Sequence, residues 1–263
     1  MQTGDKFPVG VFDTGIGGLY VLRHAMQRLP HEQFVYYADL KNAPYGDRTV
    51  EEIARLSVQA VDFLVKKGIK ALVVACNTAT SGAIELLRER HDFPVIGMEP
   101  AIRPALQQTK GYVAVMATAA TLELPKFKQL LLELDTEGRV IPVACPGLSR
   151  LIERETPGSP EIGSYLRDLL AEVPCPVEAV VIGCTHYSFI IQDIREVLGP
   201  VAIVDGTDGA IRQLDSQLQI RKIAADGGKP GGVEMFSSSM SPEDDALLRR
   251  YLTIPVDPIE AHT

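Results

Sequence analysis

The sequence has no apolar run that approaches the roughly 20 residues needed to cross a bilayer, and it has no excess of basic residues. Lysine and arginine together number 26, against 34 aspartates and glutamates, which gives a formal net charge of −8. A nucleic-acid-binding protein usually presents a basic face, so neither a membrane nor a nucleic acid is expected as a partner. Residues 1–6 lack a basic segment followed by an apolar stretch, so no secretory signal is expected and we predict a cytoplasmic location.

Cysteine is also scarce, with four in 263 residues and no C-x-x-C pair. An exported domain held together by disulfides would be shorter and richer in cysteine. A chain of this length buries roughly three-quarters of its unfolded surface, so it needs neither a disulfide nor a metal to fold. Cys145 precedes a proline and Cys175 lies between two prolines, and we interpret both as structural. Cys76 and Cys184 have a different setting.

Short apolar runs alternate along the chain with segments of helical period. The runs predict strands at 9–12, 34–38, 71–75, 94–97, 112–116, 140–143, 179–182 and 201–204. Ile53, Leu56, Ala60 and Phe63 are spaced to line one face of a helix. Strands that are apolar on both faces and separated by helices are typical of parallel sheets covered on both sides. The sequence therefore predicts an α/β protein of doubly wound type.

A weak internal echo predicts two similar lobes with mostly parallel sheets. Residues 9–14 resemble 113–118, a separation of 104, and 73–78 resemble 181–186, a separation of 108. We assign residues 1–97 and 207–263 to the first lobe and 98–206 to the second, with a loop after residue 226 and a short closing helix near 242–252. Ligands in such folds lie beyond the carboxyl ends of the strands, so Cys76 and Cys184 should both point into one cleft between the lobes.

Each of these two cysteines ends an apolar strand. Cys76 precedes a segment that begins a helix running to Arg90, and a helix N-terminus favours a thiolate. The alternative is a small buried hydrophobe, which most free cysteines are. Cys184 has His186 two residues on, a neighbour that can exchange protons with the thiol or the substrate. As zinc ligands these two residues would need two more partners at suitable spacing, and none is evident, so no metal is expected.

A glycine-rich turn, Asp13-Thr14-Gly15-Ile16-Gly17-Gly18, follows the first strand. It matches neither the dinucleotide fingerprint nor a P-loop, and we interpret it as a tight turn. Asp13 at the strand end is positioned to orient an ammonium group or to shuttle a proton. Two matched thiols on opposite sides of a carbon would supply the base and the acid that inversion of a stereocentre needs. No lysine stands in a pyridoxal-binding motif, so this chemistry would need no cofactor.

These motifs resemble those of the glutamate racemases in the Asp/Glu racemase superfamily. The matching segments are 12–19, 43–46, 76–80, 97–100, 117–121, 145–148 and 183–187. The resemblance implies cofactor-free interconversion of L- and D-glutamate, with D-glutamate supplied to peptidoglycan synthesis, and we expect a homodimer. It implies that Cys76 takes the α-proton from D-glutamate with help from Asp13, and that Cys184 takes it from L-glutamate with help from His186. Glu153 is a weaker candidate helper, because a solvated surface is the default for its charged segment. The implied substrate-binding residues are Asp13, Thr14, Tyr45, Gly46, Asn77, Thr78, Thr118, Thr185 and His186.

Three departures from the family pattern remove no catalytic group. Thr14 stands where the family usually has serine, which keeps the hydroxyl but adds a methyl group that would crowd a ligand. Ser188 replaces the usual proline, which predicts a looser start to the helix there. The tail after residue 225 matches poorly.

Three other functions stay open at this point. A racemase for aspartate or another acidic amino acid would use the same two cysteines. A two-lobed amino-acid-binding protein without chemistry would explain the cleft but leave both thiols unused. A thiol hydrolase would use Cys184 and His186 and leave Cys76 idle. Exchange of the α-hydrogen in deuterated water separates a racemase from a binding protein.

Overall fold

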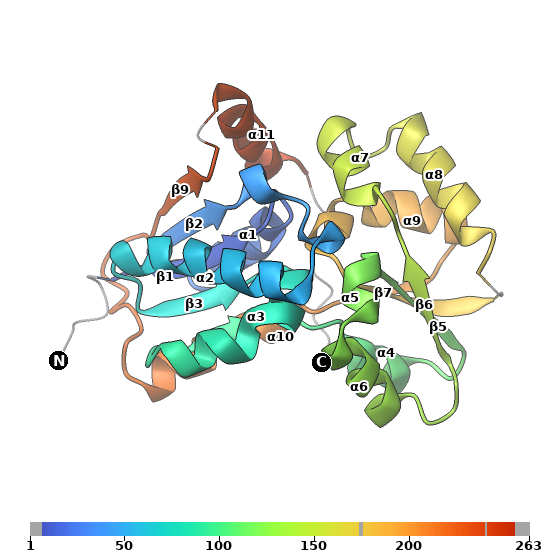
Figure 1. Ribbon diagram of the computed structural model, residues 1–263, viewed down its shortest axis with the longest axis horizontal. Helices are drawn as coiled ribbons and strands as arrows, with labels where there is room; N and C mark the ends of the chain where they lie inside the picture. The colour runs from blue at the N-terminus through green and yellow to red at the C-terminus, as the bar shows by residue number, and fades with distance from the viewer. Residues whose placement is uncertain (1–6, 174–175, 240, 256–263) are drawn as a thin grey trace.

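The computed structural model describes residues 7–173, 176–239 and 241–255, and Cys175 lies outside them. Two parallel sheets, each with its own helices, form two lobes that lie side by side in Figure 1. The first lobe contains β1 (Val9–Asp13), α1 (Gly18–Arg28), β2 (Phe34–Ala38), the 3₁₀ helices η2 (Leu40–Asn42) and η3 (Tyr45–Asp47), α2 (Val50–Lys66), β3 (Ala71–Val74), α3 (Asn77–Arg90), β4 (Val95–Gly97), α10 (Thr207–Ile220), β9 (Val233–Ser237) and α11 (Pro242–Thr253). The second lobe contains α4 (Ile102–Gln108), β5 (Tyr112–Ala117), α5 (Ala119–Glu123), α6 (Pro125–Leu134), β6 (Val140–Ala144), α7 (Leu148–Arg154), α8 (Pro160–Leu170), β7 (Val177–Ile182), the 3₁₀ helix η4 (Thr185–Ile190), α9 (Ile191–Leu198) and β8 (Ala202–Asp205).

The two sheets have the same strand order over four strands. The first runs β4-β3-β1-β2-β9, and the second, taken from its other edge, runs β8-β7-β5-β6. The pairings in both sheets are parallel. In this correspondence β5 matches β1 and β7 matches β3, which are the strands that the internal echo paired. The predicted pair of similar doubly wound lobes is therefore confirmed, while the division of the chain after residues 97 and 206 stays a prediction.

Alternation along the strands places side chains on both faces of each sheet, as a doubly wound fold requires. In β1, Phe12 belongs to the cluster that packs with Ile53 and Leu56 of α2. Val9 and Val11 belong to a second cluster, with Leu22 of α1 on the other face. Helix α2 begins with a reciprocal capping pair between Thr49 and Glu52.

The eight predicted strands are all present, with bounds within two residues of those expected. Helix α3 begins directly after Cys76 and ends at Arg90, as predicted, and α11 is the predicted closing helix. The sequence interpretation missed β9, which pairs with β2 at the edge of the first sheet inside the segment expected to be a loop. None of the helices in the described ranges is long and apolar enough to cross a membrane.

The contacts between the lobes differ in chemistry from one part of the interface to another. In one part the ring of Phe189 in η4 packs between Tyr20 of α1 and Tyr251 of α11, with centroid separations of 5.9 and 4.8 Å. We call this the aromatic contact. In another part Arg150 pairs with Asp47 at 3.3 Å, and both side chains are about two-thirds exposed. The site lies where the carboxyl ends of the strands of both sheets converge.

Candidate active site

One cavity between the lobes contains both predicted catalytic thiols. Its walls include Cys76 and Cys184 and eight of the nine predicted substrate-binding residues, the exception being Asp13. The two cysteines come from equivalent places, because Cys76 follows β3 and Cys184 follows β7. The full lining is Thr14, Leu40, Ala43, Pro44, Tyr45, Gly46, Cys76, Asn77, Thr78, Thr118, Ser149, Arg150, Glu153, Cys184, Thr185 and His186.

Cys76 is the N-cap residue of α3, as its position in the sequence predicted. Its sulfur accepts from the backbone N–H of Ala79 at 3.4 Å and from the hydroxyl of Thr14 at 3.6 Å. Burial nevertheless raises the pKa of the Cys76 thiol to about 12, and the charge of Asp13 adds to that effect. The expected preference of the helix N-terminus for the thiolate is thus outweighed, because desolvation exceeds the two hydrogen bonds. The thiol of Cys76 is therefore protonated at neutral pH.

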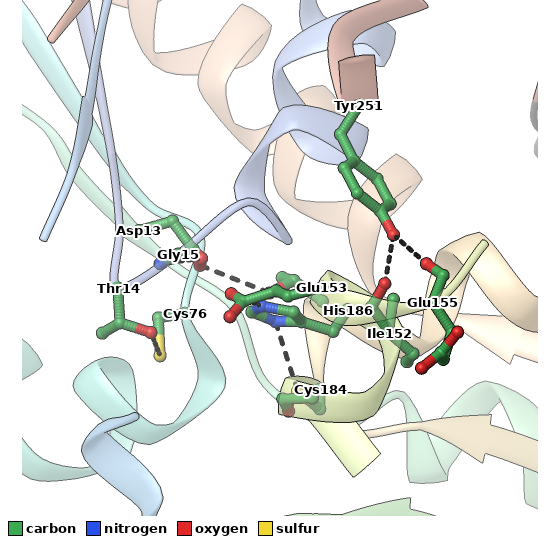
Figure 2. A network of polar contacts seen from close by, with 12 residues as sticks. Asp13, Thr14, Gly15, Cys76, Ile152, Glu153, Glu155, Cys184, His186 and Tyr251 are labelled. Atoms are coloured by element: carbon green, nitrogen blue, oxygen red, sulfur yellow. Dashed lines mark hydrogen bonds and ion pairs between the residues drawn. The ribbon is translucent and has the colours of Figure 1, made fainter. Parts of the chain in front are cut away.

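Cys184 lies against a polar set from its own lobe (Figure 2). Nδ1 of His186 is 3.9 Å from its sulfur, and Nε2 of the same ring is 2.9 Å from a carboxylate oxygen of Glu153. Burial alone would lower the pKa of His186, but the contacts with Cys184 and Glu153 outweigh it and hold this pKa well above its ordinary value. His186 thus lies beside Cys184, and its catalytic role stays a prediction. Glu153 contacts the imidazole rather than standing on a solvated surface.

Asp13 is fully buried and lies behind the cavity wall rather than on it. Its two carboxylate oxygens accept from the backbone N–H of Gly15 at 3.2 Å and from the hydroxyl of Thr185 at 3.3 Å. Burial raises its pKa to about 6, against the opposing charge of His186 and these hydrogen bonds. Direct contact between Asp13 and a substrate stays a prediction; the cavity lining includes its chain neighbour Thr14 and its hydrogen-bond partner Thr185.

The remaining predicted binding residues present hydroxyl, amide and backbone groups. Thr78 and Thr118, from different lobes, are 3.2 Å apart, and both hydroxyls also lie 2.9 Å from that of Thr121. Tyr45 donates to Asp39 at 2.7 Å, which fixes the ring at the cavity edge. The side-chain oxygen of Asn77 is buried and has no hydrogen-bond partner among the described residues. An unsatisfied buried acceptor of this kind is costly unless a ligand donates to it.

The two departures from the family pattern that fall in this region have structural explanations. The hydroxyl of Thr14 serves Cys76, as described above. Ser188 donates to a carboxylate oxygen of Asp205 at 2.7 Å, and η4 is buried along its whole length. The hydrogen bond to Asp205 anchors the segment in which the sequence predicted a looser helix start.

Sequence reasoning missed two polar residues of the lining. Ser149 of α7 places its hydroxyl 3.5 Å from the sulfur of Cys184, and Arg150 lies beside it with its ion pair to Asp47. Neither had a sequence signal beyond its place just after the matching segment 145–148. Within the part of the chain that the structure describes, no group of three or more His, Cys, Asp or Glu side chains could hold a metal ion.

Comparisons with known proteins agree with this geometry. A profile of the Asp/Glu/Hydantoin racemase family matches residues 21–214. A glutamate racemase of Clostridium perfringens (strain SM101 / Type A) is 44% identical over 245 residues, which cover 92% of this chain and 93% of the relative. The crystal structure of the glutamate racemase isoform RacE1 from Bacillus anthracis has a TM-score of 0.86 at 30% identity and covers 98% of this chain and 99% of its own. The Escherichia coli glutamate racemase in complex with L-glutamate and the activator UDP-MurNAc-ala has a TM-score of 0.82 at 28% identity, over 93% of this chain and 95% of its own. The chain therefore belongs to the Asp/Glu/Hydantoin racemase family of isomerases.

Proposed function

We propose that this protein is a glutamate racemase that interconverts L- and D-glutamate with two cysteines and no cofactor. The observation that carries the proposal is that Cys76 and Cys184, from equivalent strand ends of two similar lobes, line the same cavity. The similarity to glutamate racemases over most of the chain supports glutamate as the substrate. We extend the proposal to a homodimer in the cytoplasm that supplies D-glutamate for peptidoglycan.

In the direction from L to D, the thiolate of Cys184 removes the α-proton of L-glutamate. The electron pair left on the α-carbon is delocalised into the adjacent carboxylate. The thiol of Cys76 then gives its proton to the opposite face, which forms D-glutamate and leaves Cys76 as the thiolate. The reverse direction exchanges the two roles. The protonated state of Cys76 at neutral pH suits its role as the acid in the first direction.

The side chains around the thiols have distinct parts in this scheme. A protonated His186, oriented by Glu153, stabilises the thiolate of Cys184. The unpartnered oxygen of Asn77 accepts from the substrate ammonium group. The substrate carboxylates are held by the hydroxyls of the lining and by backbone N–H groups rather than by a basic cluster, because Arg150 is the one lysine or arginine among the described lining residues. Asp13, which does not line the cavity, influences the site through its hydrogen bond with Thr185 and through its charge near Cys76.

The test is to incubate the protein with L-glutamate in deuterated water. We expect ¹H NMR to show loss of the α-hydrogen signal while optical rotation falls to zero. A binding protein would change neither signal, and a thiol hydrolase would not exchange the α-hydrogen. Cys184→Ala should lose the activity. Cys145→Ala is the matched control, because it removes a buried thiol from the same lobe that has no part in the scheme, and it should keep the activity.

A further inference from the structure

We propose that Ser149 is a positioning residue for Cys184, whose hydroxyl donates a hydrogen bond to the thiolate that accepts the proton of L-glutamate. The inference rests on the two-cysteine mechanism proposed above and adds the Ser149 hydroxyl to the step in which Cys184 acts as the base. Ser149 is the second residue of α7, next to Leu148, and it lines the cavity with its oxygen 3.5 Å from the sulfur of Cys184. This distance is within reach of a hydrogen bond to sulfur.

The two thiols differ in the donors that the fold gives them. Cys76 caps an α-helix and accepts from the backbone N–H of Ala79 and from Thr14. Cys184 precedes a 3₁₀ helix and caps it without any side-chain hydrogen bond. In the described part of the chain, the polar contacts of its sulfur are with His186 at 3.9 Å and with Ser149 at 3.5 Å. A thiolate at Cys184 therefore depends on side-chain donors, and Ser149 is the nearer of the two.

The likeness of the two lobes explains why the donor comes from α7. In the internal echo, Thr118 stands in the second lobe where Thr14 stands in the first, so symmetry would make Thr118 the partner of Cys184. The hydroxyl of Thr118 is instead engaged with Thr78 and Thr121. Ser149 is the hydroxyl neighbour of Cys184 instead of Thr118. The sulfur of each cysteine thus has one hydroxyl neighbour from its own lobe.

Racemisation rates cannot reveal a one-sided role, because the two enantiomers have equal free energy and kcat/KM must change equally in both directions. Elimination from β-chloroglutamate is free of that constraint. The thiolate removes the α-proton, the electron pair forms the double bond to the β-carbon and chloride leaves, so only one cysteine acts. The L-configured compound reports on Cys184 and the D-configured compound on Cys76.

The experiment measures elimination from both enantiomers at pH 7.5. Ser149→Ala should slow the L-configured reaction roughly tenfold, the weak end of the range for a hydrogen bond to an ion, and leave the D-configured reaction within about twofold. Thr14→Val should show the opposite preference, since it removes the hydroxyl beside Cys76. Ser149→Thr and Ser149→Val have the same shape and differ in the hydroxyl, so threonine should retain the L-configured rate that valine loses. Alkylation of Cys184 by iodoacetamide should slow with the L-configured elimination, while that of Cys76 should not.

Equal losses with both enantiomers, or equal rates for the threonine and valine variants, would overturn the role of Ser149. The threonine–valine comparison stands even when the alanine variant folds poorly, because it needs only those two proteins. Failure of the proposed function has a different signature. In that case the unsubstituted protein processes neither enantiomer, and the assignment of Ser149 falls with it.

Discussion

Asp13→Asn should make the empty protein more stable at neutral pH while it weakens the site. Asp13 is fully buried, and burial raises its pKa from 3.8 to about 6. In the unfolded chain the carboxyl ionises near its ordinary value. Between pH 4 and 6 the folded protein therefore holds a proton that the unfolded chain has lost, so the free energy of unfolding falls as pH rises through this window. Above it, the folded protein carries a buried charge that asparagine would not have.

The size of the effect follows from the same shift. A rise of about two pKa units corresponds to roughly 3 kcal/mol of lost stability at neutral pH. Asparagine recovers that amount but has one acceptor oxygen, whereas the carboxylate uses one oxygen for Gly15 and the other for Thr185. Losing one of these hydrogen bonds costs about 1 kcal/mol. We expect Asp13→Asn to be about 1–2 kcal/mol more stable than the parent at pH 7.5 and about 1 kcal/mol less stable at pH 4.

Urea unfolding at both pH values, without substrate, measures this crossover. Glu172→Gln is the control, because it neutralises an exposed carboxylate and should change the free energy of unfolding by less than about 0.5 kcal/mol at either pH. If Asp13→Asn is less stable than the parent by the same amount at pH 4 and pH 7.5, the buried charge is not costly and the reasoning is refuted. The variant should also racemise more slowly, so its gain in stability would accompany a loss of function.

Three further predictions concern the reaction. Alanine at Cys76 or Cys184 should abolish racemisation, and serine should reduce it nearly as much, because a hydroxyl is a far weaker base than a thiol. The Cys184 variant should still eliminate chloride from D-configured β-chloroglutamate, and the Cys76 variant from the L-configured compound. Equal loss of elimination from both enantiomers would contradict the assignment of one face of the α-carbon to each cysteine. Glutamate should exceed aspartate in kcat/KM by about a hundredfold, because one missing methylene displaces the α-carbon by about 1 Å, and comparable values would disprove glutamate specificity. The pH profile of kcat/KM should be bell-shaped, since one thiol must be ionised while the other is protonated. Glu153→Gln should shift this profile, because the Glu153 carboxylate holds the pKa of His186 high. A kcat/KM that does not change with pH across the neutral range, in an assay limited by chemistry, would count against the two-thiol mechanism.

Much of this fold was predictable because several of its strands, such as β1 and β3, are buried on both faces. Such strands are largely apolar and therefore stand out in the sequence, and the shared strand order of the lobes gives similar segments at similar separations. Strand β9 left no such signal. It lies at the edge of its sheet, its residues are half-buried or exposed, and Glu234 interrupts the apolar pattern.

The site was predictable to the extent that its residues end strands. Cys76 and Cys184 could be placed in one cleft because each follows a strand of one lobe, and ligands in such folds lie beyond the carboxyl ends of the strands. Ser149 could not, because its contact with Cys184 depends on how α7 packs across the strand ends. The position of Asp13 behind the wall was equally out of reach. The strand pattern predicts where the backbone of the last strand residue lies, whereas the conformation of the following turn determines which way its side chain points.

The contacts between the lobes differ in how much free energy their separation would cost. Separating the rings of the aromatic contact would expose apolar surface at about 25 cal/mol per Å² with no compensating interaction. The Asp47–Arg150 pair is largely exposed already, and such pairs contribute about 0–1 kcal/mol, which water can replace. A second cavity, lined by Asp47, Arg150 and Ser149 among others, adjoins the first at this place and shares part of its wall. Separating the lobes beside this polar pair would therefore cost less free energy than separating them at the aromatic contact.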